Sequence, residues 1–390
     1  MRRILALCLL ALGAAPAAWA AAPKPAVQIG LDAEFSLDNS ISAQAIEQGM
    51  RIAMSEINAQ GGVLGGRKLE LVTRDNGSIP ARGIKNIREF AQMPDLVAVF
   101  GGRYSPVLLE ELPTINETGL LLLAPWSSAD PITQNDMKPN RVFRLSLRDS
   151  LAVPRMLQFA AQHGHDKVGL LLTNTGWGRS NKAAADQYAL THKKPVIVHT
   201  AWYNFKDTSL VDRYESLLKA GATAVILVAN DDEAALLVRE IAALPAERHV
   251  PIFSHWGVAG GLFTEQAGPA LSQVDFTVIQ TFSFFKARPA ALARFFASAK
   301  AFGLEKPVDV RAPTGVAHAY DLTHLLALAI NLAGSTDRNK VRDALERIPH
   351  YDGLIKTYDR PFSPTVHDAL GPEQLLMTRY RPDGALVPLP

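Results

Sequence analysis

Short runs of apolar residues alternate with helical patterns along most of the chain. Four consecutive leucines, Leu120–Leu123, and the run "LVAVF" at Leu96–Phe100 present no polar side to water. Between such runs, Ile84, Ile87 and Phe90 recur at the spacing of one helix face. Strands that are apolar on both faces are typical of parallel sheets covered by helices on both sides. The alternation therefore predicts an α/β fold built on mainly parallel sheets.

The alternation occurs in two series, which predict two lobes of similar plan. The first series has expected strands at Val27–Leu31, Lys68–Thr73, Leu96–Phe100 and Leu120–Ala124. The second has expected strands at Lys167–Thr173, Pro195–Thr200, Ala222–Ala229, Val250–Ser254 and Asp275–Thr281. Long helices are expected near Ala290–Phe302, Val316–Leu332 and Arg338–Ile348, before a hairpin around Arg381–Gly384. A chain of 390 residues is also longer than the chains that usually fold around a single hydrophobic core, which favours two domains.

The first residues have the pattern of a secretory signal peptide. Arg2 and Arg3 precede an apolar run too short to span a bilayer, and Ala18-Trp19-Ala20 matches an A-x-A cleavage site. We therefore expect residues 1–20 to be removed and the mature protein to be soluble in the periplasm. The only cysteine, Cys8, lies within this peptide, so the mature chain would have no disulfide; a lipid anchor on Cys8 is the alternative.

Charge and motif content narrow the class of function. Without Arg2 and Arg3 the chain has 38 Lys and Arg residues and 38 Asp and Glu residues, with no basic stripe for nucleic acid or a lipid surface. The sequence contains no H-E-x-x-H, no G-x-S-x-G and no P-loop, and its ten histidines are scattered. We therefore expect a binding protein rather than an enzyme, with no metal and no cofactor.

Two loops that follow expected strands carry short hydroxyl residues. "GGRYSP" at Gly101–Pro106 follows one strand, and Pro125–Asp130, which contains Ser127 and Ser128, follows the run of leucines. Ligands of open parallel sheets bind outside the carboxyl ends of the strands, so both loops are expected to face one crevice. Serines at such positions either hold an anion near helix N-termini or cap helices and turns.

Several segments, in order along the chain, resemble the type I periplasmic binding proteins, specifically the branched-chain amino acid receptor family of ABC transporters. They are "SEINAQGGVLGGRKLELVTRDNG" (Ser55–Gly77), "FGGRYSPVLLEELPTINETGLLLLAPWSSADPIT" (Phe100–Thr133), "LLLTNTGWGRS" (Leu170–Ser180), "FKDTSL" (Phe205–Leu210) and "AHAYDLTHLLALAI" (Ala317–Ile330). The resemblance covers essentially the whole chain after the signal peptide.

The resemblance implies two Rossmann-like lobes joined by three hinge crossovers, which close around a small ligand. We place the crossovers near Arg144–Arg148, Ser283–Ala287 and Tyr358–Ser363. Lobe 1 would then comprise residues 21–145 and 286–358, and lobe 2 residues 146–285 and 359–390. The implied partner is an ABC transporter permease, or a membrane-bound sensor if the protein reports ligand instead of delivering it. We expect a monomer.

The resemblance also implies the ligand-binding residues. Ser105, Ser127 and Ser128 match the positions that hold the ligand's carboxylate, and Trp177 matches a position where the family usually has a stacking tyrosine. With their neighbours, the expected ligand-binding residues are Tyr104, Ser105, Trp126, Ser127, Ser128, Trp177, Asn230, Asp231 and Trp256. Trp177 and Trp256 are expected to form an aromatic clamp. Arg103 either pairs with an anion or is a solvated surface residue.

One departure from the family pattern bears on the ligand. Amino acid receptors of the family usually have an acidic residue near the position of Trp256, where it holds the ligand's ammonium group. Asp231 and Asp232 could supply this charge, or they could cap the helix that follows. We therefore expect a ligand with an aromatic or bulky apolar body and one anionic or polar end; a branched-chain amino acid is the alternative.

Overall fold

The first lobe is built on a five-stranded parallel sheet. The computed structural model describes residues 24–38 and 40–390; the expected signal peptide and Cys8 lie outside them. Its sheet order is β2-β1-β3-β4-β5, and every neighbouring pair is parallel. The strands are β1 (Val27–Ala33), β2 (Leu69–Asp75), β3 (Leu96–Gly101), β4 (Leu121–Ala124) and β5 (Val142–Arg144). The run of leucines thus forms a strand, as predicted, and lies in the interior of the sheet between β3 and β5.

Helices cover both faces of this sheet. Successive residues of β4 point to opposite faces, so Leu121 and Leu123 join one apolar core while Leu122 and Ala124 join another. Helices α1 (Ser42–Ala59) and α10 (Pro313–Ala333) pack together, and α2 (Pro80–Ala91) packs on α3 (Ser105–Thr118). Helices α9 (Pro289–Ala299) and α11 (Arg338–Leu345) and the short ladder of β11 (His350–Asp352) and β12 (Thr357–Asp359) complete this side of the molecule.

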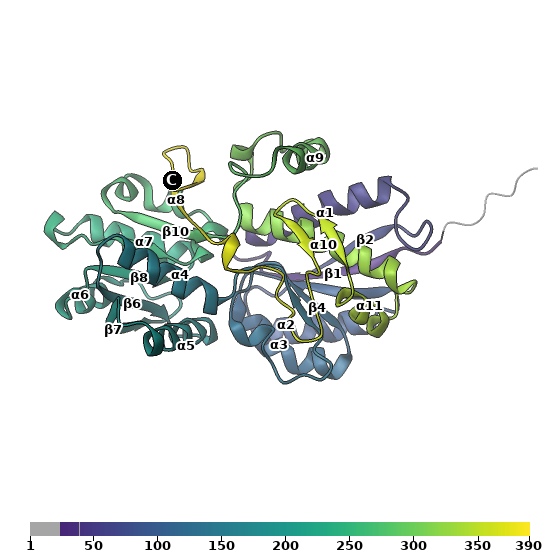
Figure 1. Cartoon of the computed structure of the whole chain (residues 1–390), viewed down its shortest axis with the longest axis horizontal. Coiled ribbons are helices and arrows are strands. Elements are labelled where there is room, and N and C mark those ends of the chain that lie inside the picture. Colours follow the sequence, from purple (N-terminus) through teal and green to yellow (C-terminus); the bar gives the residue numbers. More distant parts are fainter. Residues whose placement is uncertain (1–23, 39) are drawn as a thin grey trace, which may run out of the picture.

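The second lobe has a seven-stranded mixed sheet and lies beside the first (Figure 1). Its order is β14-β13-β10-β9-β8-β6-β7, and the five strands from β10 to β7 are parallel. They are β6 (Lys167–Thr173), β7 (Val196–Tyr203), β8 (Ala224–Val228), β9 (Ile252–Ser254) and β10 (Phe276–Gln280). The predicted C-terminal hairpin forms as β13 (Leu376–Tyr380) and β14 (Leu386–Pro388), added antiparallel to β10.

In the described part of the chain, five α-helices accompany the second sheet. They are α4 (Asp149–Gln162), α5 (Gly176–Thr191), α6 (Val211–Lys219), α7 (Asp231–Ala242) and α8 (Phe263–Ala267). Helices α3, α5 and α7 begin at Ser105, Gly176 and Asp231, close behind the ends of β3, β6 and β8. The start of α3 accommodates Pro106, which lies in the first turn, where its fixed φ suits a helix and its missing N–H costs nothing. Ser105, Trp177 and Asp231 therefore lie on first helical turns and not in loops.

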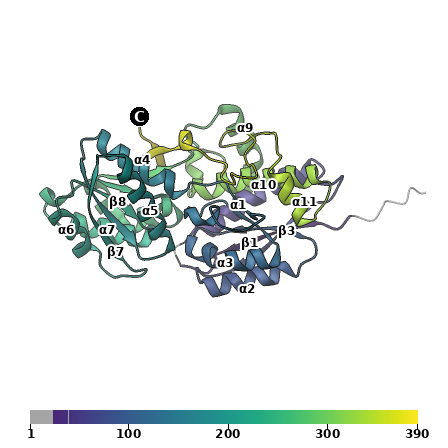
Figure 2. The ribbon, with the colours of Figure 1, turned by 60° about the horizontal axis from the view of Figure 1, so that its bottom comes forward.

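The chain passes between the two sheets after β5, after β10 and after β12. The first and third passages are tied together, because Arg144 donates its backbone N–H to the His367 carbonyl at 2.8 Å and accepts from Ala369 at 2.9 Å. The Arg144 guanidinium also pairs with Asp368 at 2.6 Å. The residue numbers assigned above to the lobe boundaries stay a prediction. Figure 2 shows the two lobes side by side from a second direction.

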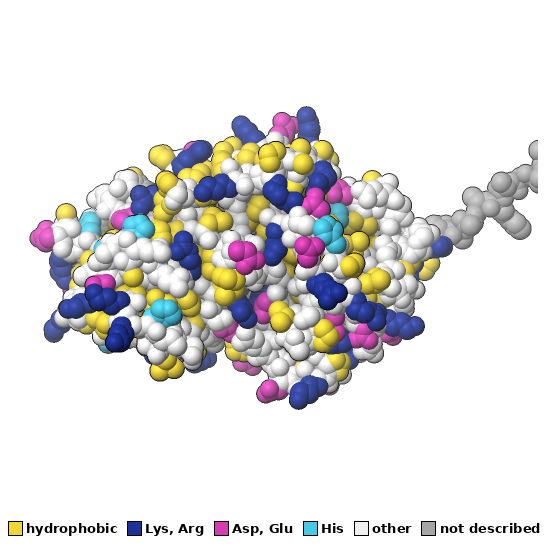
Figure 3. Space-filling model, viewed as in Figure 1, with side chains coloured by type: hydrophobic (Ala, Val, Ile, Leu, Met, Phe, Trp, Pro, Cys, Tyr) yellow, Lys and Arg dark blue, Asp and Glu magenta, His cyan; other side chains and the backbone are white. Residues whose placement is uncertain are grey.

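The face of the molecule shown in Figure 3 carries charged side chains of both signs. Basic and acidic side chains are interspersed over the face shown in Figure 3, in line with their balanced numbers. Within residues 24–38 and 40–390, none of the helices combines the length and apolar character needed to cross a bilayer. In the same residues there is no group of three or more His, Cys, Asp or Glu side chains placed to hold a metal ion.

Candidate ligand-binding site

A cavity of about 160 Å³ lies between the lobes, where helices that follow the parallel strands begin. The N-terminal ends of α3 and α5 and the residue preceding α7 all contribute to its lining. Seven of the nine predicted residues line it: Tyr104, Ser105, Trp126, Ser128, Trp177, Asn230 and Trp256. The remaining lining residues are Ser78, Arg103, Pro106, Thr173, Thr175, Phe205 and Gly257. Ser127 and Asp231 lie outside the lining.

The three predicted serines have different environments. The Ser105 hydroxyl accepts the backbone N–H groups of Ser128 at 3.2 Å and Ala129 at 3.3 Å, so it ties the two loops together. The Ser127 hydroxyl points away and donates to the Gly102 carbonyl at 2.8 Å. The Ser128 hydroxyl makes no hydrogen bond to any described residue and lies at the cavity. The Ser128 hydroxyl is therefore free to contact a ligand, Ser105 keeps an O–H proton to donate at the cavity, and Ser127 is a loop-to-loop contact.

Aromatic side chains from both lobes enclose the cavity. Trp126 of the first lobe meets Trp256 of the second edge to face, with ring centroids 6.5 Å apart. On another side, Tyr104 meets Phe205 in the same geometry at 6.3 Å. Trp177 and Trp256 both belong to the second lobe, so the tryptophan pair that meets across the cleft is Trp126 and Trp256, in addition to the Tyr104–Phe205 contact. Both indoles of the tryptophan pair are only 1% exposed, so they are buried in this arrangement of the lobes.

A buried histidine and aspartate fix the position of Trp177. The His255 Nδ1 atom accepts the backbone N–H of Trp256 at 2.9 Å, so the ring proton lies on Nε2, which donates to Asp149 Oδ1 at 3.1 Å. The Trp177 indole N–H donates to the same oxygen at 3.2 Å. Because this N–H is already used, Trp177 offers a ligand its apolar face and not its donor.

Arg103 and Asp231 form a buried ion pair across the cleft. Arg103 Nη1 lies 2.6 Å from Asp231 Oδ1, and both side chains are 3% exposed. Arg103 also donates to the Gly257 carbonyl at 3.1 Å and to the Tyr104 hydroxyl at 2.7 Å. Burial opposes its charge, but Tyr104, Asp231 and Glu34 raise the pKa of Arg103 above its usual range. Arg103 is thus not a solvated surface residue, and Asp231 is not the helix cap, which is Asn230.

The electrostatics of the cavity favour a negative or neutral ligand end. Helix N-termini carry partial positive charge and unpaired N–H groups, and those of α3, α5 and α7 converge here. Among the described residues, the lining contains no carboxylate, and its one charged group is Arg103. Asp232, the other candidate partner for an ammonium group, accepts from Gln266 at 2.6 Å on the exposed side of α7. No unpaired carboxylate therefore faces the cavity.

The lining residues that the sequence did not single out lie in the same kind of place. Thr173 ends β6 and Thr175 precedes α5, so the rule that selected Ser105 would have found both. Ser78 follows the turn "DNG" with a left-handed φ of 60°, held by its N–H to the Asn76 side chain at 2.8 Å. Phe205 follows the end of β7 and is also reached by the rule for strand ends, but its contact with Tyr104 has no signal in the sequence, because the two residues are distant along the chain.

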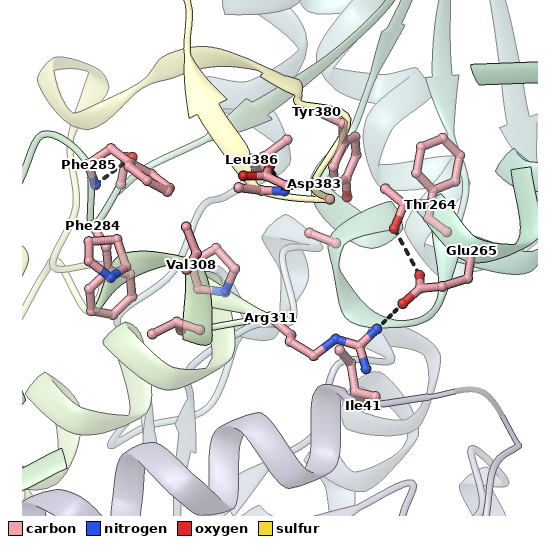
Figure 4. A pocket seen from close by; sticks show the side chains of 18 of the residues that line it. Ile41, Thr264, Glu265, Phe284, Phe285, Val308, Arg311, Tyr380, Asp383 and Leu386 are labelled. Atoms are coloured by element: carbon pink, nitrogen blue, oxygen red, sulfur yellow. Dashed lines mark hydrogen bonds and ion pairs between the residues drawn. The ribbon is translucent and has the colours of Figure 1, made fainter. Parts of the chain in front are cut away.

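A second, larger cavity of about 420 Å³ lies between α8, the C-terminal hairpin and the segment before α10. None of the nine predicted residues lines it. Its charged side chains already have partners: Arg311 pairs with Glu265, which also accepts from the Thr264 hydroxyl at 2.8 Å (Figure 4), and Asp383 pairs with Arg381 outside the lining. The smaller cavity, where the strand-end loops converge, is therefore the candidate binding site.

Known proteins share this sequence pattern and fold. The family described as "Periplasmic binding protein" matches residues 26–370. A Leu/Ile/Val-binding protein homolog of Brucella abortus is 25% identical over 374 residues, 92% of each chain. A periplasmic binding protein type 1 from Bordetella pertussis has a TM-score of 0.83 and 22% identity, over 94% of this chain and 100% of that one. A solute-binding protein from R. palustris in complex with benzoate has a TM-score of 0.75 and 17% identity, over 93% and 95%. The resemblance stated from the sequence, and the fold it implies, are confirmed.

Proposed function

The chain belongs to the periplasmic binding protein family, and we propose that it captures a small organic carboxylate with an aromatic or bulky apolar body. The observation that carries this proposal is the lining of the interlobe cavity. Three tryptophans and Phe205 supply apolar surface, the Ser128 hydroxyl and the Asn230 amide supply polar contacts, and no carboxylate is available to an ammonium group. The ring faces would hold the apolar body, and the polar end would lie near the first turns of α3 and α7.

The volume of the cavity limits the size of the ligand. A dry cavity of about 150 Å³ holds one benzene ring, so the cavity of about 160 Å³ suits a single ring or a branched alkyl group of similar size. The R. palustris protein with benzoate supports the proposal to the extent that this fold accommodates an aryl carboxylate. Larger ligands would require the lobes to close less completely.

Capture would follow from closure of the lobes. The Trp126–Trp256 contact and the Arg103–Asp231 pair both join residues of different lobes, so separation of the lobes breaks them. A ligand shifts the equilibrium toward the closed form only if it binds that form more tightly. A ligand that contacts Ser128 on one lobe and Trp177 on the other meets this requirement, because it makes both contacts only when the lobes are together.

We propose delivery to an ABC importer in the periplasm as the role of this binding. The family and the expected signal peptide support it, and the binding requires no catalysis, metal or cofactor. A sensor that presents its closed form to a membrane receptor uses the same fold and is the alternative role. A branched-chain amino acid receptor is the alternative ligand class, supported by the name of the Brucella relative and opposed by the missing free carboxylate.

Native mass spectrometry of protein purified without denaturation tests the ligand class first, since a tight receptor retains its ligand. Calorimetry then compares 3-phenylpropanoate, benzoate and 4-methylpentanoate with leucine and phenylalanine. We expect the carboxylates without an amino group to bind more tightly. Binding of leucine in preference to 4-methylpentanoate, or of no carboxylate at all, contradicts the proposal.

A further inference from the structure

We propose that Arg103 determines ligand specificity. Its guanidinium pairs with the Asp231 carboxylate, so this carboxylate is not available to the ammonium group of a ligand, and ligands that carry an amino group beside their carboxylate are excluded. This inference rests on the proposed function and adds a discriminating residue to it. The selected class would be carboxylates with hydrogen, hydroxyl, oxo or aryl substituents where an amino acid has its ammonium group.

The position of Arg103 carries the inference. Asp231 begins α7 and directly follows Asn230, which lines the cavity, yet Asp231 itself does not. The Arg103 side chain lines the cavity and reaches Asp231 with one guanidinium nitrogen, so it lies between the ligand space and that carboxylate. Removal of the Arg103 side chain would extend the cavity toward Asp231 and leave the carboxylate unpaired.

The surroundings are built to hold this pair. A side chain at Gly260 would collide with the Arg103 guanidinium, and one at Gly261 would collide with the Asp231 carboxylate. The Gly257 carbonyl and the Tyr104 hydroxyl take two further Arg103 N–H groups. The Arg103 guanidinium therefore has a fixed position with few alternatives. A group that takes the place of a ligand's ammonium group beside Asp231 must be fixed in this way.

An amino acid would have to displace this arrangement. An ammonium group buried in the cavity needs a negative partner, because burial of an unpaired charge is unfavourable. Asp231, which directly follows the lining residue Asn230, is a carboxylate within reach of the cavity, and it also takes part in the contact that joins the lobes. A ligand that took Asp231 from Arg103 would thus leave a buried arginine unpaired and oppose closure.

The test measures affinity for two matched pairs, 3-phenylpropanoate with phenylalanine and 4-methylpentanoate with leucine. In the wild-type protein the member without the amino group should bind at least about tenfold more tightly. Arg103→Met should lower this ratio by at least about tenfold, because Asp231 becomes free to hold the ammonium group. The double variant Arg103→Met/Asp231→Asn is the matched control, and its ratio should return toward that of the wild type.

Asp231→Asn supplies an independent arm should Arg103→Met fail to fold. It leaves Arg103 without its anion, so affinity for 3-phenylpropanoate should rise relative to its neutral amide, 3-phenylpropanamide. An equal loss for both members of each pair in Arg103→Met, or an unchanged acid-to-amide ratio in Asp231→Asn, overturns the inference and leaves a lobe-joining contact only. If the wild-type protein binds neither member of either pair, the proposed ligand class is wrong and this inference fails with it.

Discussion

Two buried arginine–aspartate pairs join distant parts of this chain, and they differ in what they join. Arg103 and Asp231 meet at 2.6 Å between lobes that are expected to separate. Arg144 and Asp368 meet at the same distance between two crossover segments that backbone hydrogen bonds already hold together. The same interaction should therefore contribute mainly to the stability of the fold in the second case. In the first case it should contribute mainly to closure and ligand choice.

The largest expected effect is that of Arg144→Met on stability. The variant leaves Asp368 buried without its main cation, and loss of one partner of a buried pair costs roughly 3–5 kcal/mol of unfolding free energy. Urea unfolding of the ligand-free protein measures this cost. Affinity per folded molecule should change little, because neither residue lines the cavity. If Arg144→Met proves as stable as Arg103→Met, the two pairs do not differ in their contribution to the stability of the fold.

Loss of the aromatic contact across the cleft should appear mainly in affinity. Trp126→Ala and Trp256→Ala each remove a large lining surface, and buried aromatic residues of this kind cost roughly 2–4 kcal/mol of binding free energy. Calorimetry with 3-phenylpropanoate measures this loss. Both indoles are buried, so the melting temperature of the empty protein should also fall, though less than in Arg144→Met. Unchanged affinity per folded molecule would make both residues core residues only.

The two serines after β4 separate a ligand contact from a structural one. Ser128→Ala should weaken carboxylate binding by roughly 1.5–3 kcal/mol, the range for a hydrogen bond to a charged group. Ser127→Ala should leave affinity unchanged, since its hydroxyl is bonded to the Gly102 carbonyl. The same calorimetric titration of both variants compares their affinities. If Ser127→Ala weakens binding and Ser128→Ala does not, the loop changes conformation when ligand binds.

The smallest expected effect concerns Glu111, a buried carboxyl group that forms no salt bridge with any residue of the described part of the chain. Glu111 lies beside Asp32 inside the first lobe, and burial, followed by the Asp32 charge, raises the pKa of Glu111 well above its usual value. A raised pKa in the folded state means that this group's contribution to stability is complete below about pH 4.5 and is lost as the pH rises through the raised pKa. Glu111→Gln should therefore gain stability relative to the wild type between pH 5 and pH 8 in urea unfolding. Parallel pH profiles would contradict this.

The sequence predicted the parts of the fold and site that depend on local pattern. The run Leu121–Ala124 identified a strand, and the rule for strand ends brought Ser105 and Ser128 to one cavity. It could not predict the Arg103–Asp231 pair, because the partners are 128 residues apart and meet only through the relative position of two lobes. Nor could the sequence predict that the Ser128 hydroxyl lies at the cavity and the Ser127 hydroxyl does not, since the direction of each hydroxyl depends on the turn after the strand.

The backbone bonds of Arg144 to residues 367 and 369 also bear on how ligand is released. Two of the three passages between the sheets are joined side by side, so they should bend as one ribbon instead of moving independently. Segments that move as one unit allow fewer independent motions than separate ones. The bridge at Arg144 should therefore reduce the number of ways in which the lobes can separate when ligand leaves.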